Sequence, residues 1–564
     1  MKRVILLLAA VAAAAAASAQ SSGRGWGGLL MDKDVLMPGD MVELSQTQFN
    51  FGTARAMAMA GAFTSLGADL SSMSINPAGL GMYRHSDISI TPMMSFARSK
   101  TNAPEYGRNS RDRFSMANIG VAINAYEGSG SLVSLNIGFG YNRLADLNYD
   151  YSFQRGGQRA TVGDVYSRQL YWSDVSKNDF YNAGGSGNWN WDNIAPEFWN
   201  AALAYRGFLV DQVDPDDPKS WKPTWVGNDA EMGHFTEFRS RGSIGEYTLS
   251  LGANINNKIY IGASLGIQSV YQRKYIDYGE EYYYYPGTGP DGYGNSGLDY
   301  QLLWWKLNQS VIVEGTGVNF KAGIVYRPTT NLRLGAAIHT PTYYSLDRKF
   351  QSAAAGLAYA NNDTDPNVKP DEDGYISTAG DPNMTSPVLL DDGPNNWSFV
   401  SPTRLMFGAS YTFGQRGVIS VDYERDWYNG IRIKDNPSGL DSQSWYNDSF
   451  RDNCKGANIV RVGAEFKPLP VLALRAGFGY SGSMYKDDVS PSSPLFTKTT
   501  YYGAGVGFVL GRGVLLDIAY QYVSSKTPDY YLFYVWDEEG SADSAVYSTE
   551  VKRHNVALTL GFRF

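Results

Sequence analysis

The sequence predicts an all-β fold, a 14-stranded antiparallel transmembrane β-barrel with an N-terminal hatch, or plug, in its lumen. First, residues 556–564 alternate between apolar and small or polar side chains, which is the period-two pattern of a strand. Second, comparable segments recur along the chain and are separated alternately by tight turns and by long loops. Third, residues 20–84 lack this alternation, so they are expected to lie outside the barrel wall.

The C-terminal strand defines the two faces of the predicted barrel. One face carries, in order, Val556, Leu558, Leu560, Phe562 and Phe564. A strand with one apolar face and an aromatic last residue is typical of bacterial outer-membrane barrels, whose outward face meets lipid. We therefore expect Phe562 and Phe564 to be the membrane-assembly signal read by the barrel-assembly machinery, with outer-membrane lipid against the apolar face.

The N-terminus has the pattern of a secretory signal peptide. Lys2 and Arg3 form a basic start, residues 4–17 are an apolar run, and Ala17-Ser18-Ala19 is a small-residue cleavage site. The apolar run is too short to span a bilayer. Residues 1–19 are therefore expected to be removed, leaving Gln20 as the first residue of an exported protein.

The composition fits a barrel in the bacterial outer membrane. The 564 residues include 40 Tyr and 61 Gly, and beyond the signal peptide no apolar run reaches the length of a membrane-spanning helix. The formal net charge of −8 argues against nucleic acid as a partner. The single cysteine, Cys454, excludes an internal disulfide.

The alternating segments, read in order, give fourteen expected strands within residues 85–564. They cover 88–90, 118–126, 133–141, 247–253, 259–267, 318–326, 332–338, 405–413, 419–423, 460–466, 472–480, 502–510, 514–522 and 556–564. Tight turns such as 127–131 alternate with long connections, as short periplasmic turns alternate with external loops in bacterial barrels. The long extracellular loops are expected at about 151–242, 275–316 and 341–400.

The first two long loops are rich in aromatic residues. Within them, residues 194–211 have apolar side chains at helical spacing after an early proline, which predicts a helix. Candidate ligand-capture residues in these loops are Trp172, Trp199, Tyr205, Phe208, Trp304 and Trp305. They form either an apolar surface that catches a ligand or a packed cluster that orders the loops.

Residues 51–83 read FGTARAMAMAGAFTSLGADLSSMSINPAGLGMY and carry the strongest indication of function. The Ala/Met run 54–63 is able to form a helix, Asn76-Pro77 favours a turn, and Gly79 allows a positive φ just after it. Placed between an exported N-terminus and the first strand, this segment is expected to fold into the lumen as a hatch.

This segment resembles the N-terminal hatch of the FadL/TodX family of outer-membrane transporters for long-chain fatty acids and other hydrophobic compounds. The family's Asn-Pro-Ala triplet falls on Asn76, Pro77 and Ala78, and the resemblance extends to the expected strand count and to the terminal Phe564. It implies uptake by loop capture, binding in the lumen beside the hatch, and lateral release through a gap formed by a kink in the third strand.

The resemblance also suggests residues for each step of that mechanism. Those of the hatch and its gating are Asn76, Pro77, Ala78, Gly79, Gly61 and Phe63. The third-strand kink is sought at Gly138 and Gly140 and in the polar run after Tyr141, where glycine and weak alternation disturb the strand. Arg273, Lys321 and Arg404 are candidates to pair with a ligand carboxylate.

Other functions are weighed against uptake. A surface adhesin or partner-binding barrel needs no lumen hatch. A haem-binding receptor of the same fold remains an alternative, although no CxxCH or paired-histidine site is visible. An enzyme is not expected, because Gly-x-Ser-x-Gly at 262–266 lies inside a strand and the histidines are scattered. The expected protein is a monomer with a hydrophobic small-molecule ligand and no cofactor, metal or nucleic-acid partner.

Overall fold

The computed structural model describes most of the chain outside the N-terminal 24 residues. The described residues are 25–31, 33–46, 51–103, 107–181, 189–224, 231–282, 300–360, 371, 375–437, 442–487, 489, 497–511, 513–538 and 540–564. The expected signal peptide, 1–19, lies outside them.

The wall is a closed antiparallel barrel of 14 strands, as predicted. Its strands are β2 (Asp87–Thr101), β3 (Arg108–Glu127), β4 (Leu132–Asp146) continued by β5 (Tyr149–Gln158), β8 (Met232–Ile255), β9 (Ile259–Tyr282), β10 (Tyr300–Tyr326), β11 (Leu332–His339), β16 (Arg404–Phe413), β17 (Gly417–Trp427), β19 (Gly456–Leu469), β20 (Leu472–Ser481), β21 (Lys498–Val509), β22 (Val514–Lys526) and β27 (Thr549–Arg563). The barrel closes where β2 pairs with β27, with Ile88 opposite Phe562.

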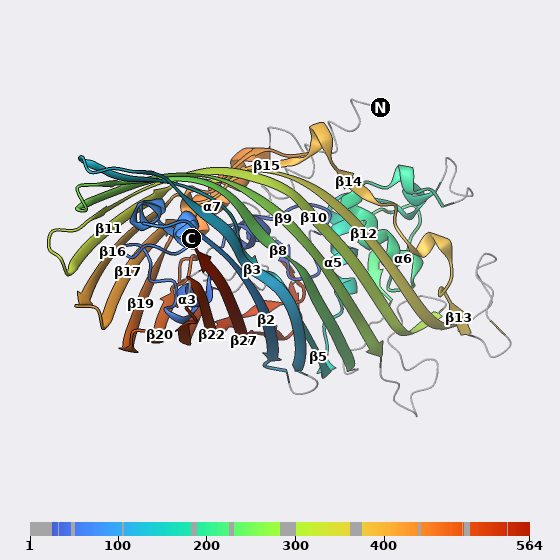
Figure 1. Ribbon diagram of the computed structural model, residues 1–564. Coiled ribbons are helices and arrows are strands. Elements are labelled where there is room, and N and C mark those ends of the chain that lie inside the picture. The colour runs from blue at the N-terminus through green and yellow to red at the C-terminus, as the bar shows by residue number, and fades with distance from the viewer. Residues whose placement is uncertain are drawn as a thin grey trace.

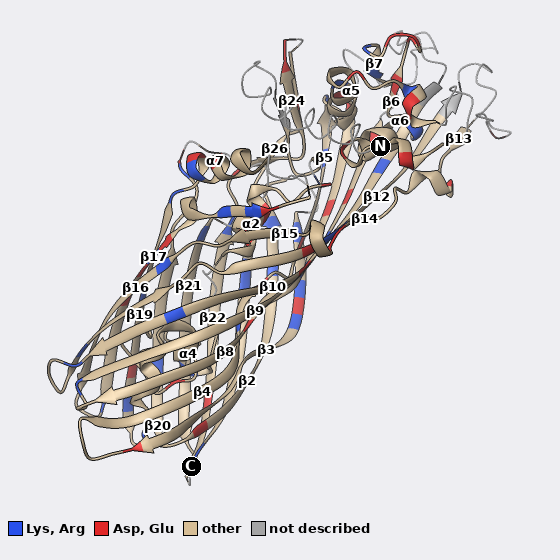
Figure 2. Ribbon diagram, turned by 90° about the horizontal axis from the view of Figure 1, so that it is seen from above, with Lys and Arg blue, Asp and Glu red and all other residues tan. Residues whose placement is uncertain are grey.

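The two ends of the barrel differ, as the alternation of turns and loops predicted. Short connections join β3 to β4, β8 to β9, β10 to β11, β16 to β17, β19 to β20 and β21 to β22, all at the end where the chain terminates. The other connections gather at the opposite end (Figures 1 and 2); most are long, as predicted, but the one from β2 to β3 covers only 102–107. We refer to these as the turn end and the loop end.

The outward face of the lower wall is apolar and exposed. Ile119, Phe139, Leu249 and Leu265 are each more than a third exposed, while residues next to them in sequence are buried in the lumen. Such a belt of exposed apolar side chains is stable only against hydrocarbon. The alternation in the sequence therefore marked the lipid-facing band of the wall.

Beyond that band the strands continue, which corrects the predicted loop boundaries. The loop expected at 275–316 is mostly strand, because β9 runs to Tyr282 and β10 begins at Tyr300. Beyond Ile267 the outward face of β9 becomes mixed, with Ser269, Arg273 and Asp277 among its residues, and the inward face is mixed as well, with Ile276 close to Lys274. A strand outside hydrocarbon has no need of an apolar outward face, so the pattern stops while the ladder goes on.

The loop expected at 151–242 is also shorter, because β5 and β8 extend into it. It holds α5 (Val162–Trp172), η2 (Lys177–Phe180), η3 (Trp191–Asn193), η4 (Pro196–Phe198), α6 (Trp199–Arg206), β6 (Val210–Gln212) and β7 (Trp221–Pro223). The helix predicted over 194–211 is thus a single turn followed by α6. It ends at Gly207, and Phe208 has a positive φ of 64°.

The seventh strand continues past its expected end. β11 stops at His339, and β12 (Tyr343–Ala360) resumes after Pro341 to pair with β10. Part of the loop expected at 341–400 is therefore wall. Its remaining elements are β13 (Tyr375–Ser377), η6 (Pro382–Met384), β14 (Leu389–Asp391), η7 (Gly393–Asn395) and β15 (Trp397–Val400).

The other elements at the loop end are short. They are η8 (Tyr428–Gly430), β18 (Arg432–Asp435), α7 (Gln443–Asn453), β23 (Tyr530–Tyr531), β24 (Tyr534–Asp537), β25 (Gly540–Asp543) and β26 (Val546–Tyr547). None of the helices in the described ranges has the length and apolar character needed to cross a membrane.

The N-terminal part of the chain lies inside the ring of strands. It contributes β1 (Gly25–Gly27), α2 (Pro38–Leu44), α3 (Ala54–Ala58), α4 (Ser72–Ile75) and η1 (Pro77–Met82). In Figures 1 and 2, α3, α4 and α2 are seen within or across the barrel. We call residues 51–83 the lumen segment and residues 25–46 the N-terminal arm.

Candidate ligand-binding site

The lumen segment is built from very short helices with specific ends. Thr53 caps α3 by accepting a hydrogen bond from the backbone N–H of Ala56, and its hydroxyl donates to Asp69. The helix predicted over 54–63 ends at Ala58, because Ala60 and Gly61 both take left-handed conformations, with φ of 55° and 72°. The turn at Gly61 directs Phe63 into a fully buried position.

Asn76 ties the lumen segment together. Its side-chain oxygen accepts from the backbone N–H of Ala78, and its amide donates to the carbonyl of Thr64 at 2.6 Å. Thr64 in turn donates its backbone N–H to Asp422 of β17 at 2.7 Å. One buried side chain therefore joins two turns of the segment and, through them, the wall.

The residues after Asn76 pack closely rather than forming an open turn. Pro77 lies against β9, where a Cβ at Gly262 would overlap its carbonyl group, and Ala78 is fully buried. Gly79 does not have a positive φ, although glycine would allow it. It is helical within η1, and a Cβ there would lie 2.7 Å from the hydroxyl of Ser72, so a lack of space explains the glycine.

The wall accommodates the lumen segment through a row of inward-facing glycines, which we call the glycine belt. Its members are Gly252, Gly262, Gly323, Gly335, Gly408, Gly463, Gly477 and Gly503, and at each a Cβ would press on the lumen segment. Several are paired across strands, such as Gly252 with Gly262 and Gly262 with Gly323. The belt lets the segment's backbone approach the wall directly.

Gly138 and Gly140 serve the same packing. Both lie in an unbroken ladder with β3 and β8, and a Cβ at Gly138 would lie 2.5 Å from the sulfur of Met73 in the lumen segment. The irregularity of the third strand lies further along, between β4 and β5, after Asp146. The two glycines are thus not the position of the break, whereas the polar run after Tyr141 leads into it.

The break separates the third strand from the second. The ladder between β3 and β4 ends at the pair Asn118–Asn142, although β4 and β5 both pair with β8, with irregularities in register. Beyond that point, in the described part of the chain, polar side chains join β3 to β5, as when Asn109 accepts from the backbone N–H of Ser152 at 2.8 Å. At this edge Phe114 of β3 is 66% exposed on the outward face.

The N-terminal arm fills the loop-side half of the lumen. Leu29 and Leu30 bond to the backbone of Tyr531 and Leu532, and Gln309 of β10 donates to the carbonyl of Leu30 at 3.1 Å. Most of the described apolar residues of the arm from Leu29 to Leu44 belong to or pack on one large core cluster with the wall and the loops. The arm is therefore an integral part of the folded interior.

A charged group fixes α2 of the arm to the wall. The ammonium of Lys274 lies 2.8 Å from Asp40 and 2.6 Å from Glu43, and the hydroxyl of Tyr149 donates to Glu43 at 3.1 Å. Burial opposes ionisation of Asp40, but the neighbouring Lys274 outweighs it and holds the pKa of Asp40 below its usual range. The carboxylate is thus charged at neutral pH.

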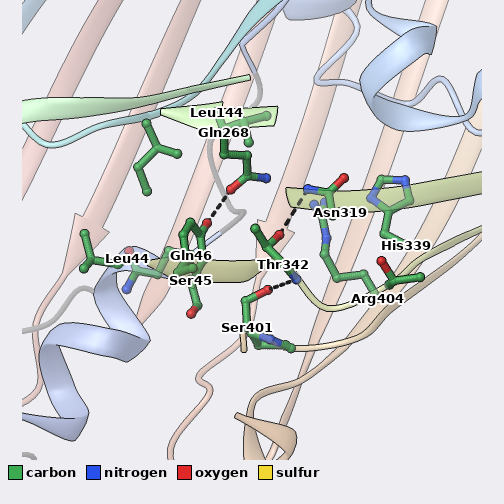
Figure 3. A pocket seen from close by; sticks show the side chains of 14 residues that line it. Leu44, Ser45, Gln46, Leu144, Gln268, Asn319, His339, Thr342, Ser401 and Arg404 are labelled. Atoms are coloured by element: carbon green, nitrogen blue, oxygen red, sulfur yellow. Dashed lines mark hydrogen bonds between the residues drawn. The ribbon is translucent and has the colours of Figure 1, made fainter. Parts of the chain in front are cut away.

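A small cavity lies between the arm and the lumen segment (Figure 3). It has a volume of about 20 Å³, room for roughly one water molecule. Leu44, Ser45 and Gln46 form its arm side, and Leu144 and Ile244 form an apolar wall. Leu144 belongs to the part of β4 that has left its ladder with β3, so the cavity reaches the break in the third strand.

The opposite side of the cavity is polar and lies at the break between β11 and β12. It is lined by Asn319, His339, Thr342, Ser401 and Arg404. His339 Nε2 bonds to the carbonyl of Ile75 at 2.9 Å, but its Nδ1 and the Oδ1 of Asn319 have no hydrogen-bond partner among the described residues. Arg404 lines the cavity with a half-buried side chain that is paired with Glu424 at 2.7 Å and with Asp426 at 3.6 Å.

The three cations singled out from the sequence have different environments. Arg404 lines the cavity, whereas Lys321 faces the lumen in an ion pair with Glu246. Arg273 lies over the ring of Tyr275 on β9. Of the three, only Arg404 lines this cavity.

The candidate capture residues are packed into the loop end. Trp199 and Trp305 are almost fully buried, Phe208 is 8% exposed, and Trp172 and Tyr205 pack against the same core cluster. The ring of Trp199 stacks on Phe350 of β12, and Tyr205 meets Trp221 edge to face. Trp304 is half-buried beneath the ammonium of Lys306. The aromatic residues thus order the loops.

Comparisons with known proteins identify the fold. No protein-family model matches the chain, and no curated protein matches its sequence. Among solved structures, a FadL homologue from Pseudomonas aeruginosa aligns over 92% of this chain and 100% of its own, with 12% identity and a TM-score of 0.50. The resemblance predicted from the sequence is confirmed at the level of the fold.

Two further structural neighbours are transporters by name. The Pseudomonas putida toluene transporter TodX is 11% identical with a TM-score of 0.45, over 92% of this chain and 99% of its own. The Ralstonia pickettii toluene transporter TbuX is 13% identical with a TM-score of 0.41, over 91% and 99%.

Proposed function

We propose that this barrel, which has the fold of a FadL homologue, takes up hydrophobic small molecules across the bacterial outer membrane. The observation that carries the proposal is the cavity between the arm and the lumen segment, because it extends to the part of β4 that has left its ladder with β3. An interior site next to a wall strand that no longer forms a ladder with its neighbour is suited to a ligand that leaves laterally into lipid.

In the proposed route, a ligand enters at the loop end, displaces Leu44–Gln46 of the arm and occupies an enlarged cavity. It then passes between β3 and β4–β5 into the membrane. An apolar molecule gains about 25 cal/mol per Å² of surface when it moves from water into hydrocarbon, so a sideways exit avoids a large cost. The exposed Phe114 would lie at the lipid side of this exit.

The lumen segment would act as the hatch. Asn76, Pro77, Ala78 and Gly79 pack against the wall below the cavity, and Gly61 and Phe63 form the turn that follows α3. His339 links the two sites, because it bonds to Ile75 just before this turn and also lines the cavity. A ligand that bound to His339 would therefore also disturb the hydrogen bond between His339 and the hatch.

The proposed ligand is an amphiphile of the fatty-acid type. Leu144 and Ile244 would contact an apolar chain, and Arg404 with the unpartnered polar atoms of Asn319 and His339 would bind a carboxylate. Uptake would need no enzymatic step. The C-terminal strand, with Phe562 and Phe564 at the turn end, would be read by the assembly machinery, and a monomer would suffice.

A cross-link across the break tests the route. In the variant with Asn109→Cys and Ser152→Cys, oxidation should join β3 to β5, because the two wild-type side chains lie within hydrogen-bond distance. We expect uptake of radiolabelled oleate by cells to fall severalfold on oxidation and to recover with reductant. Toluene is the second probe, and an effect on toluene alone would contradict the fatty-acid class.

The matched control is a cross-link where the ladder is intact. Thr499 and Ser525 face each other across β21 and β22 with their hydroxyl oxygens 3.0 Å apart. Oxidation of the pair Thr499→Cys and Ser525→Cys should leave uptake unchanged. Equal uptake by the oxidised and reduced β3–β5 variant would refute lateral release at this break.

A further inference from the structure

A groove on the outer wall, near the loop-side ends of β17, β19, β20 and β21, lies apart from the lumen. It has a volume of about 490 Å³ and is lined by Arg425, Lys455, Asn458, Tyr480, Asp487 and Lys498, among others. Val460 and Tyr480, on its membrane side, are exposed on the lipid-facing surface. The groove therefore opens toward the surroundings of the barrel.

The strand register places the groove at the edge of the lipid-facing band. On β17 the outward residues run from Val421 through Tyr423 to Arg425, and Arg425 is opposite Asn458 of β19. Residues two apart along a strand are about 7 Å apart, so the cations lie about one such step beyond the tyrosines. Tyrosine marks the interface of a membrane, and the next step outward is the level of lipid headgroups.

The groove carries an excess of positive charge. Three of its residues, Arg425, Lys455 and Lys498, are cationic, and Asp487 is its one carboxylate. Lys455 pairs with Asp487 at 2.8 Å, but this carboxylate is 96% exposed, so the pair is easily exchanged for another anion. Lys498 has no ion-pair partner within the described ranges, and basic residues gather near this end of the wall in Figure 2.

We propose that this groove binds the phosphate headgroup of a membrane lipid in the outer leaflet. Arg425 and the two lysines would hold the phosphate oxygens, because guanidinium and ammonium groups form strong charge-assisted bonds to phosphate. The amide of Asn458 and the hydroxyl of Tyr480 add polar contacts beside it. The acyl chains would lie along the apolar residues directly below, including Val460 and Val421.

The test compares lipid affinities of purified full-length protein by native mass spectrometry, with palmitoyl-oleoyl phosphatidylglycerol and inorganic phosphate as probes. In the triple variant Arg425→Gln, Lys455→Gln, Lys498→Gln we expect the affinity for the lipid to fall roughly tenfold or more, because charged hydrogen bonds are lost. The control is Lys219→Gln, Lys222→Gln, Arg451→Gln, which removes the same charge from loop-end elements and should bind as the wild type does.

Two results would overturn the proposal. One is equal affinity of the wild type and the triple variant for phosphatidylglycerol. The other is displacement of the lipid by millimolar inorganic phosphate, which would assign the groove to free phosphate. The variants change exposed side chains, and a heat-shifted band on an unboiled gel verifies that each barrel is folded.

Discussion

At the scale of single residues, the interior of this barrel is specified by glycines as much as by polar contacts. Gly323 of β10 faces Asn76, and a Cβ at this position would overlap the side-chain oxygen of Asn76. The same oxygen accepts from Ala78, and the amide bonds to Thr64. A single methyl group would therefore disturb a side chain that joins two turns of the lumen segment.

Gly323→Ala is expected to destabilise the folded barrel by roughly 1–3 kcal/mol, the usual cost of overpacking. The readout is the temperature at which the compact band is lost on an unboiled gel, together with proteolysis within residues 51–83. Gly130→Ala is the matched control, because no atom lies within 4 Å of a Cβ there. Equal stability of the two variants would contradict close packing at the belt.

The sequence identified Asn76, Pro77, Ala78 and Gly61 as special but could not identify the belt. An inward-facing glycine looks like any small residue in the alternating pattern, and only the strand register brings eight of them to one level. The reason for the glycine at position 79 was not visible in the sequence either. A glycine required for lack of space and one required for its backbone conformation are identical in a sequence.

At the scale of elements, the arm and the broken third strand determine what the lumen can do. The arm is held by Lys274, which lies between Asp40 and Glu43. Its C-terminal end, Leu44–Gln46, covers the cavity. An element that is attached by a charged cluster and closes a site is well placed to control access to it.

The attachment of the arm is expected to be insensitive to pH until the medium is strongly acidic. The pKa of Asp40 is lowered below 3.8 in the folded protein, so its stabilising effect is complete above 3.8 and is lost as the pH falls through the lowered pKa. The protection of residues 33–46 against hydrogen exchange, relative to the intrinsic exchange rate at each pH, should be constant from pH 8 to about pH 4 and should fall below that.

Lys274→Met should loosen the arm at every pH, because it leaves two buried carboxylates uncompensated, at a cost of roughly 3–5 kcal/mol. Lys219→Met, on an exposed loop, is the control. Wild-type protection of the arm in Lys274→Met would show that apolar packing alone holds it.

Strands were predictable from the sequence only where lipid faces them. Residues 259–267 alternate clearly, whereas the rest of β9, to Tyr282, mixes polar and apolar residues on both faces. The same loss of alternation concealed the upper part of β10 with Trp305, which the sequence placed in a loop. The packing of the arm could not be predicted from the sequence, because its apolar residues lack the period-two alternation of the wall strands. Their partners also lie on several strands that are distant in the sequence.

At the scale of the whole molecule, two chain segments close the lumen at two levels. The lumen segment contacts strands around the barrel through the glycine belt, and the arm fills the loop-side half above it. The small cavity lies between these two levels. The lumen segment thus closes the barrel at the lower level and the arm closes it at the upper level. Beside the cavity between them, the ladder between β3 and β4 has ended.

Removal of residues 25–46 distinguishes the role of the arm in ligand access from the role of the lumen segment in sealing the barrel. With the lumen segment intact, we expect oleate binding to become several times faster, whereas the ionic conductance in planar bilayers should stay at the wild-type level. Replacement of 25–46 by a Gly-Ser chain of equal length should give the same result. A rise in conductance in either variant would mean that the arm, and not the lumen segment, seals the barrel.

The glycine belt also has a consequence for how the protein is made. The lumen segment is synthesised before the first strand, but it is enclosed only when β2 meets β27, the last strand. Once that seam is closed, the packed interior leaves no path for a segment that was left outside. The lumen segment must therefore pack against the strands while the sheet is still open. Substitutions in the glycine belt should then lower the amount of barrel that is assembled into the membrane more than they lower the stability of the assembled barrels.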